Sequence, residues 1–533
     1  MKGVLCFFAL FVCRFYAVHC ESGATQAGLR EKAKGPLGKV LFVAVVGSKS
    51  HKNFYYGVSE ALANAGYEVT ILTPYQPSRK IKNVREIVLE SNDIAPHMAN
   101  VWKDGSFAPI WQLTKFGPEL CAKALAADEY SEVLKEKFDI AFVSVFFCEC
   151  FLGHINAMNI PFVFVNPAEM IGPFSGARMG NPTFPTIDEN PMLSFPRPMS
   201  FVHRFISSLS EVMLGAMTTY FSYCADSVVR SQGLLPPGTP YLPDIYRNAS
   251  LMIANSFRLA EHPRPYMPNI LLLGGIHLKT PKPLEKDLND WVESSGDAGF
   301  IFFSLGSAVR ASDMPAETIN LLLEVFKSLE QKVLWKFNLP DLGVDLPPNV
   351  RLTTWAPQQD LLGHPKMRLF ITHGGLFSTQ EATYHGVPVL GLPVFGDQPG
   401  NMLKAEAQGW GLKLDWDELS HDRLRSAILR LIDDPVARQR VATIGALMRD
   451  RPTSPGDDIV WWTGYIIRTG GARHLQSGAV HVSWYQLYNV DVWAVVVLFV
   501  LLILWVEWKI VLFIYRRIVS KPASDVSKKR KKH

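Results

Sequence analysis

The chain has 533 residues, of which 48% are hydrophobic and 19% charged, so it is long enough for two large domains and too apolar to be disordered. Its formal net charge of +5 would suit a polyanionic partner if the charge were spread over the body. The tail from residue 516 to 533 instead contains eight lysines and arginines and one aspartate, which gives +7 and leaves the other 515 residues at −2. This distribution disfavours nucleic-acid binding.

Residues 1–20 have the pattern of a signal peptide. Lys2 precedes the apolar run 4–12, which is too short to span a bilayer. Val18 and Cys20 are small enough for the positions before a cleavage site, which predicts a mature chain starting near Glu21. A buried N-terminal strand is the alternative interpretation.

Alternating strand and helix patterns follow, as in parallel sheets covered by helices. Continuous apolar runs at 39–46, 138–147 and 162–165 predict buried strands, and a helix is expected from Asn53 to Ala65, ended by Gly66. Residues 167–198 predict a long loop. The apolar-rich helix expected at 201–230 would contact the acceptor, the membrane or the protein core.

Prolines cluster from Pro263 to Pro283, which predicts a boundary between domains at 21–280 and 281–455. The second α/β series begins with the apolar strand at 299–307. The region 456–490 is predicted to contain a helix at 458–469, followed by a juxtamembrane segment.

The stretch from Val492 to Tyr515 is apolar except for Glu507 and Lys509, and as a helix its 24 residues would reach about 36 Å. We predict a single transmembrane helix at 491–515 and a basic cytosolic tail at 516–533, because the arginines directly after the span favour the cytosolic side. Lys529 and Lys531 resemble the dilysine retrieval signal of endoplasmic reticulum membrane proteins. An electrostatic anchor to anionic lipid is the alternative.

Two further sequence features concern the chemistry of the body. Beyond residue 20 the cysteines are Cys121, Cys148, Cys150 and Cys224, and their spacing fits no metal site; they allow one disulfide, with both its existence and its pairing open. Asn248-Ala-Ser is an N-glycosylation sequon.

The densest group of polar residues lies between Trp355 and Gln398. The segment FITHGG predicts a strand, a glycine turn that starts at His373, and then a helix with Ser378 and Glu381. Such a turn directs free backbone N–H groups and the positive helix end at an anion. A generic strand-to-helix turn would explain the glycines but not their polar neighbours.

Each polar residue of this stretch suits one part of a nucleotide sugar. His373 and Ser378 can donate to a phosphate that approaches Gly375, and Glu381 can accept from a ribose. Trp355 can stack on a base whose edge Gln358 satisfies. Asp397 and Gln398 follow the next strand, at the edge where ligands bind in open α/β sheets, and suit sugar hydroxyls.

This segment resembles the signature of the UDP-glycosyltransferase superfamily, including the animal UDP-glucuronosyltransferases and UDP-glucosyltransferases. The resemblance extends to RPYMPNILLLGGIHLKTPKPL and FFSLGS and covers nearly the whole mature chain. It implies the GT-B fold, in which two Rossmann-like α/β domains face each other, with the acceptor in the first and the UDP-sugar in the second. It also implies that Ser307, His373, Gly375 and Ser378 contact the diphosphate. Many members have asparagine where this chain has Phe377.

The resemblance places the general base at His51, which follows the first strand in VVGSKSHKNFYYG. The acid that usually orients this histidine would stand at Ser144, and a serine cannot replace it. Glu149, five residues later, matches an alternative pattern and is predicted to be the acid. A surface glutamate at a strand end is the other interpretation, in which case His51 works alone.

No metal cofactor is expected, with UDP-glucose or UDP-glucuronate as co-substrate. Asp415-Trp-Asp417 matches a DxD metal pattern, but it stands between a strand and a helix where Asp417 suits an N-cap. Arg264 resembles an arginine associated with the glucuronate carboxylate, yet its motif also occurs in members that use UDP-glucose. The donor sugar therefore stays open.

Together these patterns predict an inverting glycosyltransferase, single-pass type I in the endoplasmic reticulum membrane, that transfers glucose or glucuronate from UDP to a hydroxyl of a small lipophilic acceptor. The first alternative is a non-catalytic UDP-sugar-binding partner of another glycosyltransferase, favoured by Ser144 and Phe377. A second is transfer to a lipid or glycan. The chain lacks GxGxxG and GK[ST] motifs after its first strand, which disfavours dehydrogenases and P-loop nucleotidases. A homo-oligomer is left open.

Overall fold

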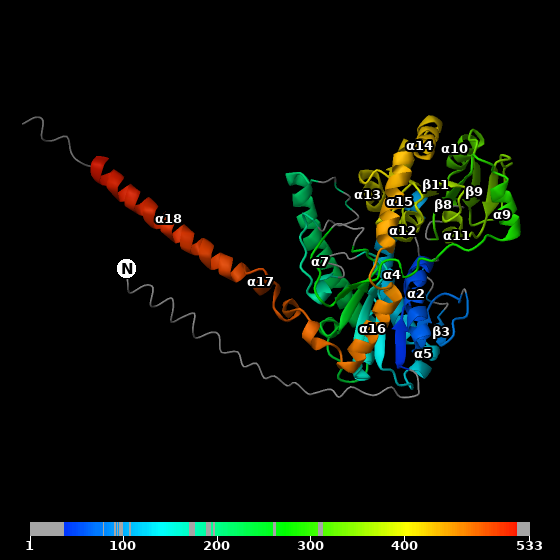
Figure 1. The fold of residues 1–533 in the computed structure, drawn as a ribbon. Coiled ribbons are helices and arrows are strands. Elements are labelled where there is room, and N and C mark those ends of the chain that lie inside the picture. The colour runs from blue at the N-terminus through cyan, green and yellow to red at the C-terminus, as the bar shows by residue number, and fades with distance from the viewer. Residues whose placement is uncertain are drawn as a thin grey trace, which may run out of the picture.

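The computed structural model describes residues 37–519 apart from 78, 90–91, 93, 95–99, 106–107, 170–175, 188–192, 194, 196–197, 259–262, 308–312 and 340. The strands in this part of the chain form two sheets, and every strand pair is parallel (Figure 1). The predicted signal peptide and the dilysine-like residues lie outside the described residues.

The first sheet has seven strands in the order β3-β2-β1-β4-β5-β6-β7. Their bounds are β1 (Lys39–Val43), β2 (Glu68–Thr73), β3 (Val84–Val88), β4 (Ile140–Ser144), β5 (Phe162–Asn166), β6 (Leu251–Ala254) and β7 (Ile270–Leu272). Strands β4 and β5 are buried at every position, which explains their continuous apolar sequences.

Helices cover both faces of this sheet. One face packs against α4 (Ala108–Leu125), α5 (Asp128–Val133), α6 (Leu152–Ala157), α7 (Phe201–Ser231) and α8 (Leu242–Tyr246). The other packs against α2 (Lys49–Ala65), which ends as predicted at Gly66 in the left-handed conformation, with φ 105°. Helix α2 begins four residues earlier than expected, so His51 lies in its first turn and not in a loop.

The second sheet has six strands in the order β10-β9-β8-β11-β12-β13. They are β8 (Phe300–Ser304), β9 (Lys332–Lys336), β10 (Val350–Thr353), β11 (Met367–Thr372), β12 (Val389–Gly391) and β13 (Gly411–Lys413). Its helices are α9 (Lys286–Glu293), α10 (Ala316–Lys327), α11 (Gln358–Leu362), α12 (Leu376–His385), α13 (Gln398–Ala407), α14 (His421–Ile432) and α15 (Pro435–Arg449). Helices α10 and α14 contribute to the core on one face, and α9, α11, α12, α13 and α15 to the core on the other.

The chain then returns to the first sheet. Helix α16 (Pro455–Arg468) packs on α2, and its Ile459 and Ile466 are buried in the core of the first sheet (Figure 1). Two short elements, η9 (Gly478–His481) and α17 (Trp484–Leu487), lead to α18 (Val490–Val519). Of the described helices, α18 is the one long and apolar enough to cross a membrane, and it projects away from the body (Figure 1).

Side chains of the second sheet's helices contact the first sheet's layer directly. Gln380 on α12 donates to the carbonyl of Asn255 at 3.0 Å, and Lys404 on α13 pairs with Glu169 at 3.3 Å. On the other side, Trp102 of α3 (Val101–Asp104) packs edge-on against Trp416, with ring centroids 4.8 Å apart. These contacts bring the start of α12 against the end of β1.

Candidate active site

The turn between β11 and α12 has free backbone donors. Gly374 adopts φ +80°, which favours glycine, and its N–H donates to the hydroxyl of Thr372 at 3.3 Å. Gly375 is the N-cap residue of α12 and has no side chain to cap the helix, while the Asp397 carboxylate accepts from the backbone N–H of Leu376. The first turn of α12 therefore presents N–H groups and a positive helix end, as the sequence predicted for an anion site.

The ring of His373 lies between two glycines. A Cβ atom at Gly306 would be 2.5 Å from its Cε1, and one at Gly375 would be 2.5 Å from its Nε2. The imidazole is buried, and burial, followed by the nearby Lys336 ammonium, lowers its pKa to about 4. His373 is therefore neutral at pH 7 and can donate one N–H at the anion site, while Ser307 lies exposed after Gly306.

A hydrogen-bond network occupies the position predicted for uridine. The amide nitrogen of Gln358 donates to Glu381 at 2.5 Å and to Ser378 at 3.3 Å, and Gln359 donates to the other Glu381 oxygen at 3.2 Å. Trp355 follows β10 with 70% of its surface exposed, so its ring is open to a stacking partner. The structure thus brings together the residues predicted for base and ribose.

Burial raises the pKa of Glu381 to about 7, against an ordinary value of 4.5. Since the folded-state value is the higher one, this group's contribution to stability is greatest below pH 4.5 and is lost as the pH rises to about 7. We expect Glu381→Gln to raise the free energy of unfolding by about 2 kcal/mol at pH 8 and by much less at pH 5. Thermal unfolding at both pH values measures this difference. Unequal stabilisation at the two pH values, together with weaker UDP binding, would identify Glu381 as a functional residue retained at a cost in stability.

Asp397 and Gln398 lie where α13 starts, next to the anion turn. Asn401 donates to the Asp397 carboxylate at 2.7 Å and to the Gly374 carbonyl at 2.9 Å, so this pair is fixed to the turn. Burial raises the pKa of Asp397, and the Glu169 carboxylate adds to the rise. The Gln398 oxygen accepts from the backbone of Val394 at 2.8 Å and Phe395 at 3.1 Å, so its contribution to a ligand is reduced to the amide nitrogen.

Two lysines at this site were missed by the sequence analysis. Lys336 ends β9 and donates to the Gly306 carbonyl at 3.3 Å, and burial lowers its pKa while Glu381 raises it. The positive charge of Lys49, in the first turn of α2, also lowers the pKa of Lys336. The sequence did contain a signal for Lys336, since it is a cation at the end of an apolar strand. It contained none for Lys49, because the proximity of Lys49 to this site depends on how the two sheets meet.

His51 faces the second sheet's layer. Its ring centroid is 4.6 Å from that of Phe146 and 6.4 Å from that of Phe377, which lies in the first turn of α12. Burial lowers the pKa of His51 to about 4. The predicted base and the predicted anion turn therefore belong to one site, because Phe377 stands two residues after Gly375.

The predicted acid Glu149 has no contact with His51. Its carboxylate pairs with Arg178 at 2.9 Å, both side chains are buried, and the Nδ1 atom of His51 has no hydrogen-bond partner among the described residues. Ser144 bonds instead to the Tyr55 hydroxyl at 2.8 Å. Because Arg178 already neutralises Glu149, the geometry gives no support to the predicted pairing.

Two of the four cysteines in the body are joined by a disulfide. Cys121 and Cys150 form a disulfide with a Cα–Cα distance of 6.1 Å. Among the described residues no group of three histidine, cysteine, aspartate or glutamate side chains converges to hold a metal.

The prediction that Asp417 caps a helix is wrong. Asp417 lies in a 3₁₀ turn, and Ser420 caps α14 by accepting from the backbone N–H of Arg423 at 3.3 Å.

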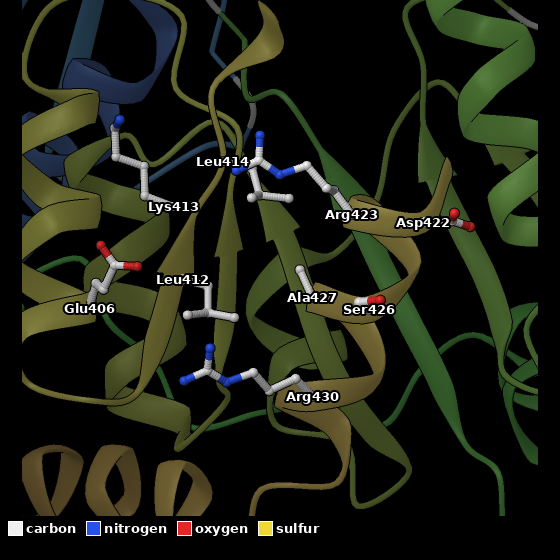
Figure 2. Close-up of a pocket in the computed structure, with 9 residues that line it drawn as sticks. All are labelled: Glu406, Leu412, Lys413, Leu414, Asp422, Arg423, Ser426, Ala427 and Arg430. Carbon is white, nitrogen blue, oxygen red and sulfur yellow. The ribbon is translucent and has the colours of Figure 1, made fainter. Parts of the chain in front are cut away.

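A hollow of about 430 Å³ lies at the edge of the second sheet. Figure 2 shows its lining from α13, β13 and α14, including Glu406, Leu412, Arg423 and Arg430. None of the predicted site residues lines it. The α12 turn is therefore the candidate active site, and we assign no ligand to this hollow.

Two parallel α/β sheets with a candidate site where they meet define the GT-B fold. Solved structures agree: the glycotransferase of kitacinnamycin superposes with a TM-score of 0.56 at 18% identity, over 80% of this chain and 98% of that one. A UDP-glucosyltransferase from Polygonum tinctorium superposes with a TM-score of 0.54 at 16% identity, over 82% and 99%. These identities establish the fold alone.

Sequence comparison is more specific. The family described as "UDP-glucoronosyl and UDP-glucosyl transferase" matches residues 39–524, so the chain belongs to that family and is a UDP-glycosyltransferase. UDP-glucosyltransferase 2 of Dactylopius coccus is 31% identical over 82% of this chain and 86% of its own length. UDP-glucuronosyltransferase 2B7 of Homo sapiens is 30% identical over 92% and 95%.

Proposed function

We propose that this enzyme transfers glucose, with inversion, from UDP-glucose to the hydroxyl of a small lipophilic acceptor, and that His51 is the general base. The supporting observation is the position of His51 beside Phe377, in the first turn of the helix whose start forms the anion turn. A base on the first sheet's helix and a phosphate site on the second sheet's helix are what a single displacement needs.

In the proposed reaction the acceptor oxygen attacks the anomeric carbon, its proton passes to His51, and the bond from that carbon to the UDP oxygen breaks. Burial lowers the pKa of His51 to about 4, so the imidazole is unprotonated at pH 7 and available as a base, and the same shift makes it a weaker base than an ordinary histidine. The α12 N–H groups, His373 and Lys336 would stabilise the negative charge on departing UDP. Trp355 and Gln358 would hold uracil, Glu381 the ribose, Ser378 and Ser307 the diphosphate, and Asp397 with Gln398 the glucose.

The choice of glucose over glucuronate rests on charge. The pKa of Asp397 is raised partly by the Glu169 carboxylate, so two acidic groups stand near the sugar position, and the Lys404 ammonium there is already paired with Glu169 at 3.3 Å. Phe377 adds an apolar ring, whereas a uronate would need a donor or a cation there. The names of the relatives do not decide the donor, since that of Dactylopius coccus is a UDP-glucosyltransferase and that of Homo sapiens a UDP-glucuronosyltransferase.

We expect kcat/KM to be at least about 10-fold higher with UDP-glucose than with UDP-glucuronate, because a third carboxylate would be repelled. Turnover of a simple phenol by detergent-solubilised protein with each donor measures this ratio. Glu169→Gln should reduce it. Equal rates with the two donors, or a preference for glucuronate, would contradict the assignment, and UDP release without a phenol glycoside would count against the acceptor class.

For location we propose a single-pass type I protein of the endoplasmic reticulum membrane, with the body in the lumen and α18 as the anchor. The exposed side chain of Asn248 is accessible for glycosylation in that compartment. The disulfide between Cys121 and Cys150 suits an oxidising lumen. Sensitivity of the mature protein to endoglycosidase, abolished by Asn248→Gln, tests the orientation.

One observation favours the second candidate, a non-catalytic UDP-sugar-binding partner. Within the described part of the chain no carboxylate pairs with His51, since Ser144 bonds to Tyr55 and Glu149 to Arg178. Purified protein that binds UDP-glucose but never releases UDP faster than its His51→Ala variant would establish this alternative.

A further inference from the structure

Helix α7 buries mostly small and polar side chains, together with Ala225 and Val229, and exposes large apolar ones. The buried positions include Ser207, Thr218, Ser222 and Asp226. The exposed positions recur at helical spacing and are mostly large and apolar, namely Phe205, Leu209, Val212, Met213, Tyr220 and Tyr223, each with at least half of its surface exposed. A helix of a water-soluble body has the opposite arrangement, so the outer face of α7 is adapted to a less polar environment than water.

This outer face carries no charge between Arg204 and Arg230. Glu211 is turned away from it and accepts from the hydroxyl of Thr183. Asp226 is buried and pairs with Arg230 at 2.7 Å. The charged side chains therefore stand at the ends of the face, where they would reach water from an apolar layer.

The loop on the inner side of α7 is joined to the segment that leads into α18. Ser477 donates to the carbonyl of Gly180 at 3.1 Å, which fixes the chain before the span to the loop at 180–187. That loop covers the inner side of α7, since Ser207 donates to the carbonyl of Pro185 at 2.7 Å. Helix α18 starts 13 residues after Ser477 (Figure 1). Even fully extended, 13 residues reach only about 45 Å, which is close to the length of α7.

We propose that the outer face of α7 lies in the surface of the bilayer that α18 crosses, as an in-plane interfacial helix. This proposal rests on α18 being the membrane anchor. Lipid suits the face better than a second copy of the chain does, because a specific protein interface carries about one hydrogen bond per 100–200 Å². Phe205, Leu209, Val212 and Met213 offer none. The tyrosines Tyr220 and Tyr223 at one end suit the headgroup level.

This placement joins the bilayer to the catalytic base. Phe221 on α7 is 6.4 Å, centroid to centroid, from Phe147, and the neighbouring Phe146 packs on His51. An acceptor dissolved in the lipid would therefore meet an aromatic path from α7 to the imidazole. Its concentration beside His51 would follow its partition into lipid and not its solubility in water.

The test uses full-length protein in nanodiscs, with a bimane label on Val212→Cys in a Cys224→Ser background. Doxyl-labelled lipids should quench this label several-fold more strongly than a label on Lys327→Cys, which is exposed on α10 at the opposite side of the body (Figure 1). A label on Val497→Cys, within α18, is the positive control. UDP-glucose turnover is measured on the same samples, so the lipid contact and the proposed activity are tested separately.

Equal, weak quenching at positions 212 and 327 would overturn the proposal. If the label on position 497 were quenched at the same time, the anchor would stand and only the contact of α7 would fail. Absence of quenching at position 497 would overturn the membrane span and this inference together. Crosslinking between two Val212→Cys chains without quenching would show that a second copy covers the face, which also contradicts the lipid contact.

Discussion

His51→Ala should lower kcat by about 10²–10⁴-fold, the usual contribution of a positioned general base, and leave the affinity for UDP within about twofold. The imidazole lies on α2, in the first sheet's layer, whereas the UDP residues lie on the second sheet. Initial rates with UDP-glucose and a phenol measure kcat, and titration calorimetry with UDP measures the affinity. A loss of both would indicate that the variant has disturbed the fold.

His481→Ala is the matched control, because that imidazole is exposed on η9 and its loss should leave both kcat and the affinity for UDP unchanged.

Glu149→Gln tests whether Glu149 is the partner of His51 or only of Arg178. If Glu149 serves only Arg178, the variant should lose stability, since it removes the negative charge that faces a buried guanidinium, and should retain kcat. A loss of kcat at full stability would instead restore Glu149 as the partner of His51.

The pH dependence of kcat/KM belongs to the same prediction. The pKa of His51 is lowered to about 4, so the imidazole is in its basic form at every pH above about 5. The value of kcat/KM should therefore not change through protonation of His51 between pH 8 and pH 5, and it should fall below pH 5. A carboxylate partner would stabilise the charged imidazole and move this fall upward, toward pH 6 or 7.

Much of the site was predictable because its residues follow one another along the chain. The segment from β10 to α13 supplies Trp355, His373 and Asp397, which stand after a strand or at a helix start, and Glu381, which lies in the second turn of α12. In a parallel sheet those positions share one edge, so order along the sequence translates into proximity. The end of α2 at Gly66 was predictable for a similar local reason.

The errors concern contacts between residues far apart in sequence. Arg178 neutralises Glu149 from 29 positions away, and no local pattern announces that pair. Helix α16 was expected after the second series of strands, but nothing in its own sequence says that Ile459 and Ile466 pack beneath the first sheet. The sequence also suggested that Gln398 offers a whole amide, whereas the preceding turn uses its oxygen. The residue type indicates which hydrogen bonds a side chain can make. The tertiary contacts decide which of its atoms remain available to a ligand.

Gly375→Ala should weaken UDP binding by at least about 10-fold, equivalent to about 1.4 kcal/mol, with little change in stability. The glycine has φ −61°, a value that alanine adopts freely, so backbone strain does not enter. The new Cβ would stand 2.5 Å from Nε2 of His373, and the other side of that ring is closed by Gly306. The ring must therefore leave the position in which it can donate to a phosphate.

Gly215→Ala is the control for this substitution, because a Cβ there meets nothing within 4 Å and its helix would be stabilised slightly. Calorimetry with UDP alone, without acceptor, isolates the diphosphate site from the base. Gly306→Ala would be a poorer test, since Gly306 has φ +75° and the variant would combine strain with the clash. If Gly375→Ala bound UDP as tightly as the wild type, His373 would not be a phosphate ligand. The anion would then be held by the α12 N–H groups and Lys336, and a variant at Lys336 should carry the loss.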